Sequence, residues 1–413
     1  MRFALLLPAL LAAPLSAQEK WTTVPLIPGG PVPWREQATV RSRDFASASP
    51  VEWKVTWNRL HGGKEEGVDL ILLDNGKLRI TVIPTRGMGI LSVDRSGKKP
   101  STARLGWRSP VEEIVHPKLI NLYARGGLGW LDGFNEWLCR CGLENVGQPG
   151  PDTIITNTGD KATIDLPLHG RIANIPASWV ALEVENVKPF RIKLRGAVKE
   201  SMVFGPNFEL QTEISTLPGS DTFTVRDVVV NRSAGEREFQ LLYHLNFGPP
   251  LLEKGSRLVA PLEKVTPFNA NAAKDAERFD QFLGPTPGYV EQVYLMQPIA
   301  DKKDMVNVLL HNEKKDVGCL LSYGAKALPH LTLWKNTGAV VDGYVVGIEP
   351  GTSFPNRRAV ERKAGRVPKL EAGGRHETTL RFQLLEGKTD VADAEAEVRR
   401  AQGKRDTVIE KTP

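Results

Sequence analysis

A carboxylate and an imidazole stand at the ends of two apolar segments of this chain. Glu349 follows the run YVVGI and precedes a proline turn, and His244 lies within LLYHLNFGPP. Because a carboxylate is costly to remove from water, Glu349 has two interpretations. Either the strand ends there and the charge meets solvent, or Glu349 is a general base held at the mouth of a pocket. A histidine across that pocket supplies the matching general acid, and such proton transfers typically contribute about 10²- to 10⁴-fold in rate.

The elements that must position these residues read as a succession of short strands. The segments are rich in β-branched and aromatic residues, often alternate polar with apolar residues, and are separated by Gly, Pro, Asn and Asp. Helical periodicity is nearly absent before DVADAEAEVRRAQ near the C-terminus. The pattern predicts an all-β fold, a large antiparallel β-sandwich with few short helices. The clearest predicted strands are 51–57, 68–73, 78–83, 190–198, 208–215, 222–230, 238–247, 306–311, 318–323, 330–334, 344–349 and 379–385.

The N-terminus predicts export. Residues 1–17 contain one arginine, an apolar stretch and small residues before a plausible cleavage site, which is typical of a secretory signal peptide. No later segment approaches 18 uninterrupted apolar residues, so we expect a periplasmic or extracellular protein without a membrane anchor after signal removal. We predict an extended lead-in over 18–34, one β-sandwich domain over 35–388, and a solvated helix and tail over 389–413.

Charge and cysteine content exclude some classes of protein. The formal charge is +6, but the basic residues are scattered, so nucleic acid is not an expected partner. The three cysteines, Cys139, Cys141 and Cys319, cannot form a disulfide framework. In an extended segment the side chains of Cys139 and Cys141 point to the same face. A metal or redox site there lacks nearby Cys or His partners, so buried thiols are the favoured interpretation.

Three segments resemble the aldose 1-epimerases, or galactose mutarotases. YHLNFG is similar to their NH-x-YFNL segment, GIEPGTSFPN to their LEP…N segment, and LHGRIANIPASW to the HG…W segment, particularly of the hexose-6-phosphate mutarotase branch. Residues 126–150, GGLGWLDGFNEWLCRCGLENVGQPG, resemble the hallmark of the subgroup called DUF4432. Almost the whole mature chain thus resembles the galactose mutarotase-like superfamily, whose fold is an extended antiparallel β-sandwich.

The resemblance implies a role for three matching residues. Glu349 would take the proton of the anomeric hydroxyl, His244 would protonate the ring oxygen, and His169 would bind a hydroxyl nearby. It implies a sugar or sugar derivative as the ligand, no metal and no organic cofactor. The sequence departs from the family pattern at Tyr243, where the epimerases have Asn, and at Arg171, where the sugar-phosphate branch has an aromatic residue. The choice of sugar therefore does not carry over.

Further polar and aromatic residues are candidate substrate contacts. Each also has a structural interpretation, such as a salt bridge for an arginine or core packing for a tryptophan. The two aspartates are alternatives for the substrate-binding aspartate of the family. The candidates are Arg86, Asp132, Asn135, Trp334, Lys335 and Asp342.

Three functions fit this pattern. The first is a mutarotase that uses Glu349 and His244. The second is a lyase, hydratase or isomerase that applies the same pair to an oxidised sugar, and the third is a carbohydrate-binding protein without catalysis. Because plain binding needs neither an acid nor a base, the presence of both residues favours an enzyme.

Overall fold

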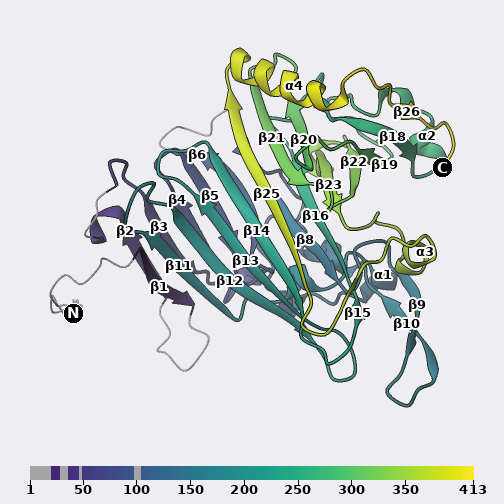
Figure 1. Cartoon of the computed structure of the whole chain (residues 1–413), viewed down its shortest axis with the longest axis horizontal. Coiled ribbons are helices and arrows are strands. Elements are labelled where there is room, and N and C mark those ends of the chain that lie inside the picture. Colours follow the sequence, from purple (N-terminus) through teal and green to yellow (C-terminus); the bar gives the residue numbers. More distant parts are fainter. Residues whose placement is uncertain (1–19, 28–35, 46–48, 97–103) are drawn as a thin grey trace.

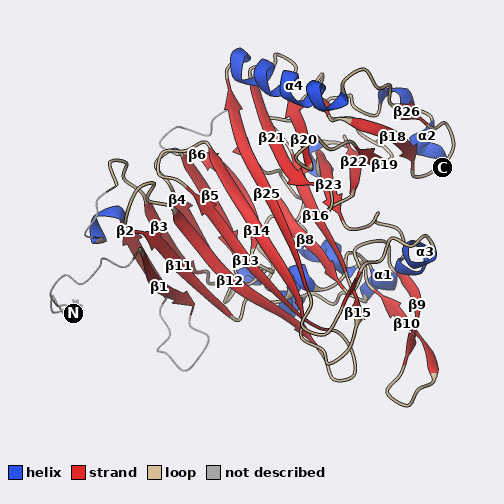
Figure 2. Ribbon diagram, in the orientation of Figure 1, coloured by secondary structure: helices blue, strands red, loops and turns tan. Residues whose placement is uncertain are grey.

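The structure is a computed structural model that describes the chain except for residues 1–19, 28–35, 46–48 and 97–103. The predicted signal peptide, residues 1–17, and the Pro- and Gly-rich part of the predicted lead-in both lie outside the described residues. The predicted all-β fold is confirmed. Two large sheets pack face to face, and the few helices lie at their margins (Figures 1 and 2).

The first sheet has nine strands, all joined by antiparallel pairing. In spatial order they are β1 (Trp21–Ile27), β11 (Trp179–Glu185), β12 (Ile192–Ser201), β13 (Asn207–Thr216), β14 (Thr222–Asn231), β25 (Arg375–Glu386), β21 (Val317–Gly324), β20 (Met305–His311) and β17 (Arg257–Val259). The start of the predicted lead-in is therefore an edge strand of the sandwich.

The second sheet has thirteen strands and carries the candidate site. In spatial order they are β2 (Gln37–Arg41), β3 (Lys54–Arg59), β4 (Asp69–Asp74), β5 (Leu78–Ile83), β6 (Gly89–Arg95), β8 (Leu138–Leu143), β16 (Gln240–Phe247), β23 (Val345–Gly351), β22 (His330–Asn336), β19 (Gln292–Pro298), β18 (Leu262–Pro267) and β26 (Val408–Ile409), with β7 (Arg104–Leu105) paired to β6.

Short elements complete the fold, and some border the site. The remaining strands and the helices are β9 (Gly150–Ile155) with β10 (Lys161–Leu166), β15 (Arg237–Glu238) with β24 (Lys369–Leu370), α1 (Ala124–Gly127), α2 (Ala270–Ala273), α3 (Arg358–Lys363) and α4 (Lys388–Gln402). No helix among the described residues combines the length and the apolar character needed to cross a membrane.

The sequence of β16 is largely apolar because both faces of the strand are buried. Successive side chains of a strand point to opposite faces. Leu241, Tyr243 and Leu245 join the core between the two sheets, whereas Leu242 packs in a separate cluster on the other face. His244 lies on that second face. Both faces of this strand are covered, so the site is built on the outer face of a strand whose inner face holds the sheets together.

A buried polar cluster joins the two sheets directly behind the site. Arg140 of β8 makes two hydrogen bonds to Asp227 of β14, Nε to Oδ2 at 2.5 Å and Nη2 to Oδ1 at 3.0 Å. The hydroxyls of Tyr243 and Thr212 also donate to this carboxylate, at 2.7 and 2.6 Å. Both charged side chains are fully buried, so each depends on these partners for its solvation.

The C-terminal region differs from the predicted solvated helix and tail. The helix is present as α4, but Val391, Ala394 and Val398 pack against leucines of the first sheet. The chain then returns as β26, parallel to β18. The apolar stripe of α4 is hard to recognise in the sequence. It contributes only one small or branched side chain per turn, and acidic and basic residues fill the positions between.

The three cysteines are free and buried, as the favoured interpretation predicted. Cys139 and Cys141 pair with His244 and Leu242 of β16 across the sheet. The two thiols thus lie on the face that carries the site.

Candidate active site

A cavity of about 780 Å³ lies on the outer face of the second sheet. Its floor is formed by the neighbouring strands β16, β23 and β22, and its walls come from loops that follow other strands. The lining is rich in aromatic rings, which suit the apolar face of a sugar ring. The aromatic members are Trp107, Trp130, Phe134, Phe268 and Trp334, and the charged and imidazole members are His169, His244, Glu291, Asp342, Glu349 and Arg357.

His244 and Glu349 meet at the floor of this cavity. Strands β16 and β23 are paired with Leu245 opposite Ile348, which brings the two side chains side by side on one face. The distance from His244 Nε2 to Glu349 Oε1 is 3.2 Å. The residues are 4% and 2% exposed, so nearly all of their contact with water has been lost.

Asn246 assigns the tautomer of His244. Its Nδ2 atom donates to the carbonyls of Glu136 and His244, at 2.9 and 3.3 Å, so its Oδ1 atom faces the imidazole. The distance from Oδ1 to His244 Nδ1 is 2.6 Å. An amide oxygen only accepts, so Nδ1 carries the hydrogen and Nε2 faces Glu349.

The pKa values of the pair move in opposite directions. Burial raises the pKa of Glu349 to about 8, against the opposing charge of His169. Burial, with the charge of His169, holds the pKa of His244 well below its usual range. At neutral pH these shifts leave one proton on the pair, on the Glu349 carboxyl, with Nε2 of His244 unprotonated and 3.2 Å away. Such a pair can accept one proton and deliver another.

His169 forms a second charged pair beside the first. Its Nδ1 atom lies 2.7 Å from the carbonyl oxygen of Val146, and its ring centre is 5.3 Å from that of His244. Burial alone would lower the pKa of His169, but the charge and hydrogen bond of Cys141 raise it to about 9. Burial would likewise raise the pKa of the Cys141 thiol, but a hydrogen bond from Cys139 and the charge of His169 lower it to about 6. The two pKa shifts together favour a proton on His169 and the thiolate form of Cys141.

Trp334 and Gly347 shape the space above the pair. The Trp334 ring centre lies 5.5 Å from that of His244, and its Nε1 atom donates to Glu291 at 2.7 Å. A Cβ atom at Gly347 would lie 2.5 Å from Glu349 Oε1 and 3.2 Å from the Trp334 ring. The glycine therefore leaves the room in which Glu349 meets a ligand.

Comparison with known proteins identifies the family. Residues 65–384 match the family described as "Domain of unknown function (DUF4432)". The chain belongs to the DUF4432 family. A crystal structure of a Klebsiella pneumoniae protein, named as a candidate aldose 1-epimerase, is 36% identical, covers 95% of this chain and 99% of its own, and superposes with a TM-score of 0.88.

More distant structures confirm the fold of this DUF4432 protein. A galactose mutarotase-like protein of Clostridium acetobutylicum is 14% identical, covers 80% of this chain and 98% of its own, and has a TM-score of 0.52. Galactose 1-epimerase of Lactobacillus acidophilus is 12% identical, covers 81% and 99%, and has a TM-score of 0.50. A comparison with curated proteins found no match. The predicted resemblance to the galactose mutarotase-like superfamily is confirmed.

Five of the predicted site residues lie around one cavity in the DUF4432 protein. They come from sequence positions as far apart as 169 and 349, and the sheet topology brings them together. Among the described residues, no group of three or more His, Cys, Asp or Glu side chains is arranged to hold a metal ion. The five residues are His169, His244, Trp334, Asp342 and Glu349.

Arg86 and Asn135 lie behind the wall of the cavity. Arg86 Nη2 forms an ion pair with Glu136 Oε1 at 2.9 Å, and both side chains are fully buried. The Asn135 amide donates to the carbonyls of Val111 and Glu113. The structural interpretation therefore holds for Arg86, and the predicted substrate contacts of both residues are corrected: their polar groups fix the loops that form the wall.

Asp132 and Lys335 also point elsewhere. Asp132 forms an ion pair with Arg125 at 3.2 Å. Lys335 follows Trp334 in β22, so alternation turns it to the opposite face, where its Nζ donates to the carbonyl of Arg278 at 3.2 Å. Burial lowers the pKa of Lys335 to about 8. The prediction of a charged donor beside Glu349 is therefore wrong for Lys335.

Sequence reasoning missed other residues of the site. Asn246 stands two residues after His244, so the same alternation that places His244 could have placed it on the same face. Trp130 lies within the segment that resembles the DUF4432 hallmark, and its ring centre is 4.7 Å from that of His169. Arg357 carries no comparable signal, because only the packing of distant loops brings it to the cavity.

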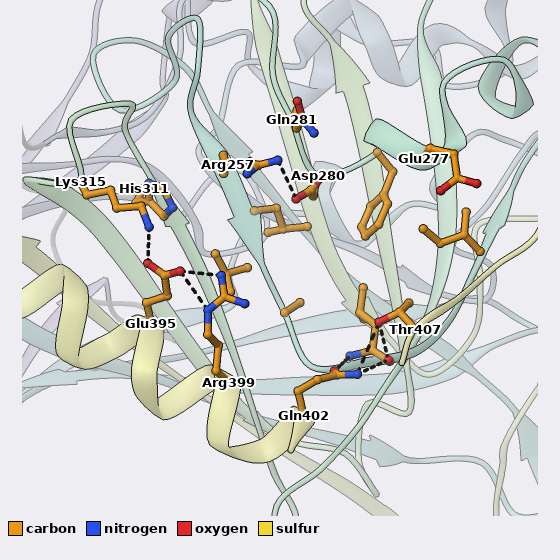
Figure 3. Close-up of a pocket in the computed structure, with 16 residues that line it drawn as sticks. Arg257, Glu277, Asp280, Gln281, His311, Lys315, Glu395, Arg399, Gln402 and Thr407 are labelled. Carbon is orange, nitrogen blue, oxygen red and sulfur yellow. Dashed lines mark hydrogen bonds and ion pairs between the residues drawn. The ribbon is translucent and has the colours of Figure 1, made fainter. Parts of the chain in front are cut away.

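A second cavity, of about 420 Å³, lies between α4 and the end of β17 (Figure 3). Most of its charged side chains pair with one another, and Glu277 pairs with Lys411 outside the lining. Glu395 accepts from Lys315 and Arg399, each at 2.6 Å, and Arg257 lies 3.5 Å from Asp280. Because these charged groups are already paired, this cavity offers a ligand fewer free polar groups than the first cavity does.

Proposed function

We propose that this DUF4432 protein is a mutarotase, an enzyme that interconverts the anomers of a sugar. The observation that supports the proposal is the buried pair of His244 Nε2 and Glu349 Oε1, 3.2 Å apart, on the floor of a cavity walled by aromatic rings. The Klebsiella pneumoniae relative, 36% identical and named as a candidate aldose 1-epimerase, supports the same class of isomerase.

Glu349 and His244 together accept one proton and donate one proton in each half of the anomer exchange. Transfer of the pair's one proton from Glu349 to Nε2 of His244 makes Glu349 a carboxylate. The carboxylate then takes the proton of the anomeric hydroxyl, while the Nε2–H of His244 protonates the ring oxygen. The bond between C1 and the ring oxygen breaks and C1 becomes a carbonyl. Rotation about the bond to C1 presents its other face to the ring hydroxyl. Closure by the reverse transfers gives the other anomer and restores the pair.

Neighbouring residues stabilise this exchange. The imidazolium of His169 places a positive charge beside Glu349, which favours the carboxylate form needed in the first step. Trp334 offers a ring face for stacking, with its indole nitrogen held by Glu291. Asn246 keeps the protonatable Nε2 of His244 directed at the substrate.

Anomer exchange measured by saturation-transfer NMR tests the proposal. The purified protein is incubated with a panel of aldoses, uronic acids and 3-keto sugars, in parallel with Glu349→Gln. We expect faster exchange for one class of sugar and loss of that acceleration in the variant. Binding without accelerated exchange, or new product signals, would overturn the assignment as a mutarotase.

We also propose that the protein acts outside the cytoplasm, as residues 1–17 have the composition of a signal peptide. Cell fractionation with N-terminal sequencing tests this point. The expected result is a periplasmic or secreted protein that begins at Gln18. A cytoplasmic protein with an intact Met1 would contradict it.

A further inference from the structure

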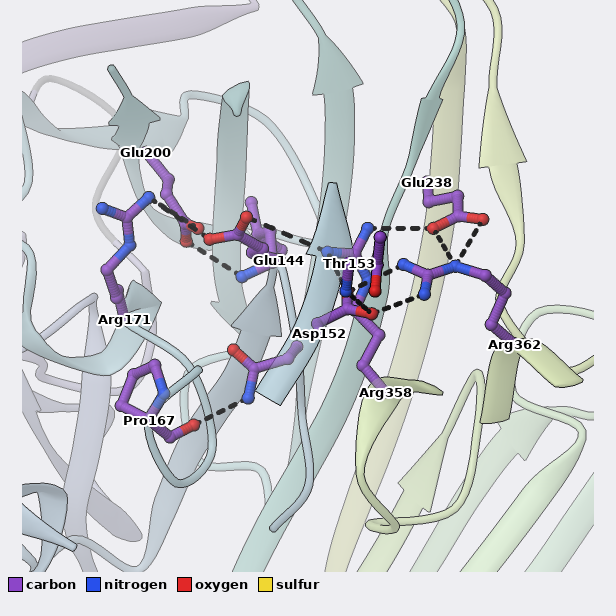
Figure 4. A network of polar contacts seen from close by, with 11 residues as sticks. Glu144, Asp152, Thr153, Pro167, Arg171, Glu200, Glu238, Arg358 and Arg362 are labelled. Atoms are coloured by element: carbon purple, nitrogen blue, oxygen red, sulfur yellow. Dashed lines mark hydrogen bonds and ion pairs between the residues drawn. The ribbon is translucent and has the colours of Figure 1, made fainter. Parts of the chain in front are cut away.

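Arg357 is the arginine of the cavity lining, and no carboxylate partner occurs for it among the residues that the structure describes. Its neighbours in the sequence differ. Arg358 lies 3.4 Å from Asp152, and Arg362 binds the same carboxylate at 2.6 Å and Glu238 at 2.9 Å (Figure 4). The α3 arginines are therefore structural, whereas the guanidinium of Arg357 remains available at the cavity.

The backbone that carries Arg357 is firmly held. The N–H of Gln148 donates to the carbonyl of Pro355 at 3.1 Å, and the N–H of Val360 donates to the carbonyl of Arg357 at 2.9 Å. The paired Arg358 follows immediately. Arg357 itself is exposed, and its side chain has no polar partner among the described residues, so the backbone is fixed while the guanidinium is free to meet a ligand.

Gly150 makes the room for that side chain. A Cβ atom at this position would lie 2.9 Å from Nε and 3.1 Å from Cδ of Arg357. The arginine therefore lies across the backbone at the start of β9. Gln148 and Pro149, just before this point, line the same cavity. The φ of Gly150, +151°, favours glycine at this position, and the missing side chain leaves the guanidinium of Arg357 at the edge of the cavity.

Acidic residues and Arg357 give the cavity lining an uneven distribution of charge. Glu291 accepts a hydrogen bond from Trp334, and Asp342 is exposed in the loop between β22 and β23. These carboxylates suit sugar hydroxyls, which donate, and they repel an anion. A negatively charged ligand group is therefore directed to Arg357.

We propose that Arg357 anchors an oxyanion group of the substrate, so that the sugar bound by this site carries a carboxylate or a phosphate. This inference rests on the proposed function for the identity of the ligand as a sugar. The planar fork of a guanidinium pairs with either group through two parallel hydrogen bonds. A neutral sugar would leave the guanidinium without that partner.

Binding in the Glu349→Gln background tests the proposal without turnover. Dissociation constants for D-glucose, D-glucuronate and D-glucose 6-phosphate are measured by calorimetry for this protein and for Arg357→Gln and Arg357→Lys made in it. Arg400→Gln is the control, because Arg400 is exposed on α4, has no carboxylate partner among the described residues and gives the same change in net charge. The uronate and the phosphate tell which oxyanion is recognised.

We expect one anionic sugar to bind about 10- to 100-fold more tightly than glucose, as charged hydrogen bonds allow. Arg357→Gln should abolish this preference, Arg357→Lys should keep part of it, and Arg400→Gln should keep it all. Equal affinity for the three sugars, or a preference that survives Arg357→Gln, would overturn the inference. If Arg357-dependent binding is found but the parent protein accelerates no anomer exchange, the anchor stands and the mutarotase proposal fails.

Discussion

The Nε2 atom of His244 lies 3.2 Å from the Oε1 atom of Glu349, at the floor of the larger cavity. Because Asn246 accepts the hydrogen of Nδ1, Nε2 is the imidazole nitrogen that faces Glu349. We expect two ionisable groups this close to titrate as a unit, with apparent pKa values that belong to the pair.

This coupling predicts a bell-shaped pH profile for kcat/KM. Below the lower pKa, which burial places under 6.5, both groups are protonated and no base remains. Above about 8, the raised pKa of Glu349, the shared proton is lost and no acid remains. The measurement is anomer exchange by NMR from pH 4 to 10, corrected for the spontaneous rate. A rate that climbs steadily beyond pH 9 would contradict the shared proton.

Glu349→Gln should reduce activity by about 10²- to 10⁴-fold, the usual contribution of a general base. It should also stabilise the fold. A folded pKa of about 8, against 4.5 for a free carboxyl, means that the native state binds more protons than the unfolded state between those values. Stability is therefore lost as pH rises through this window, on the order of 3 kcal/mol at pH 7.

Urea unfolding of the parent and Glu349→Gln at pH 4 and pH 7 measures this effect. The variant should be the more stable protein at pH 7, and the two should converge at pH 4. Equal stability at pH 7 would mean that ionisation of Glu349 does not lower the free energy of unfolding.

Asn246 should act as a positioning residue for His244. Asn246→Leu removes the acceptor and should lower kcat by about 10- to 100-fold, as for other groups that orient a histidine. Asn246→Asp keeps an acceptor and adds a charge, which raises the pKa of His244 and should move the acid limb of the pH profile to higher pH. A purely structural role would lower activity in both variants without moving that limb.

Gly347→Ala should fill the space above the pair. Its Cβ atom would lie 2.5 Å from Glu349 Oε1, so the carboxylate must shift, and we expect about a 10²-fold loss of kcat/KM from even a 1 Å displacement. Gly324→Ala in β21 is the matched control, because its Cβ atom would make only an ordinary contact at 3.6 Å. Similar kinetics for both variants would contradict the assignment of this space to the substrate.

Asp227→Ala should destabilise the fold by about 3–5 kcal/mol, because it leaves the charge of Arg140 buried and unpaired. The double change to Arg140→Met with Asp227→Leu removes both charges and should recover most of the loss. Chemical denaturation measures both. A mild effect of Asp227→Ala would show that water reaches this cluster.

The sequence predicted the fold and the centre of the site for physical reasons. Strand alternation and turn residues depend on local sequence, so the β-sandwich could be read from them, and Glu349 and His244 stood out because charge is rare in apolar strands. Lys335 was misplaced although the same alternation separates it from Trp334. The sequence did not decide between a substrate contact and a salt bridge for Arg86. Its partner Glu136 is fifty residues away, and only the folded chain brings the two together.

Arg357 and Cys141 illustrate what local sequence does not contain. The role of Arg357 depends on the absence of a side chain at Gly150 in another element. The lowered pKa of the Cys141 thiol depends in part on His169, which a loop after β10 brings to it. Contacts of this kind are set by tertiary packing, and the sequence around either residue does not specify them.

The division of β16 between two faces has a practical consequence for protein engineering. Tyr243 holds the sheets together, and His244 is the proposed acid of the site, while much of the cavity wall comes from loops. A mutant library confined to 107–111, 128–131 and 337–342 would vary the wall and leave the hydrogen-bonded strands intact. This scaffold is therefore suited to directed evolution, in which acceptance of new ligands is selected without loss of the folded protein.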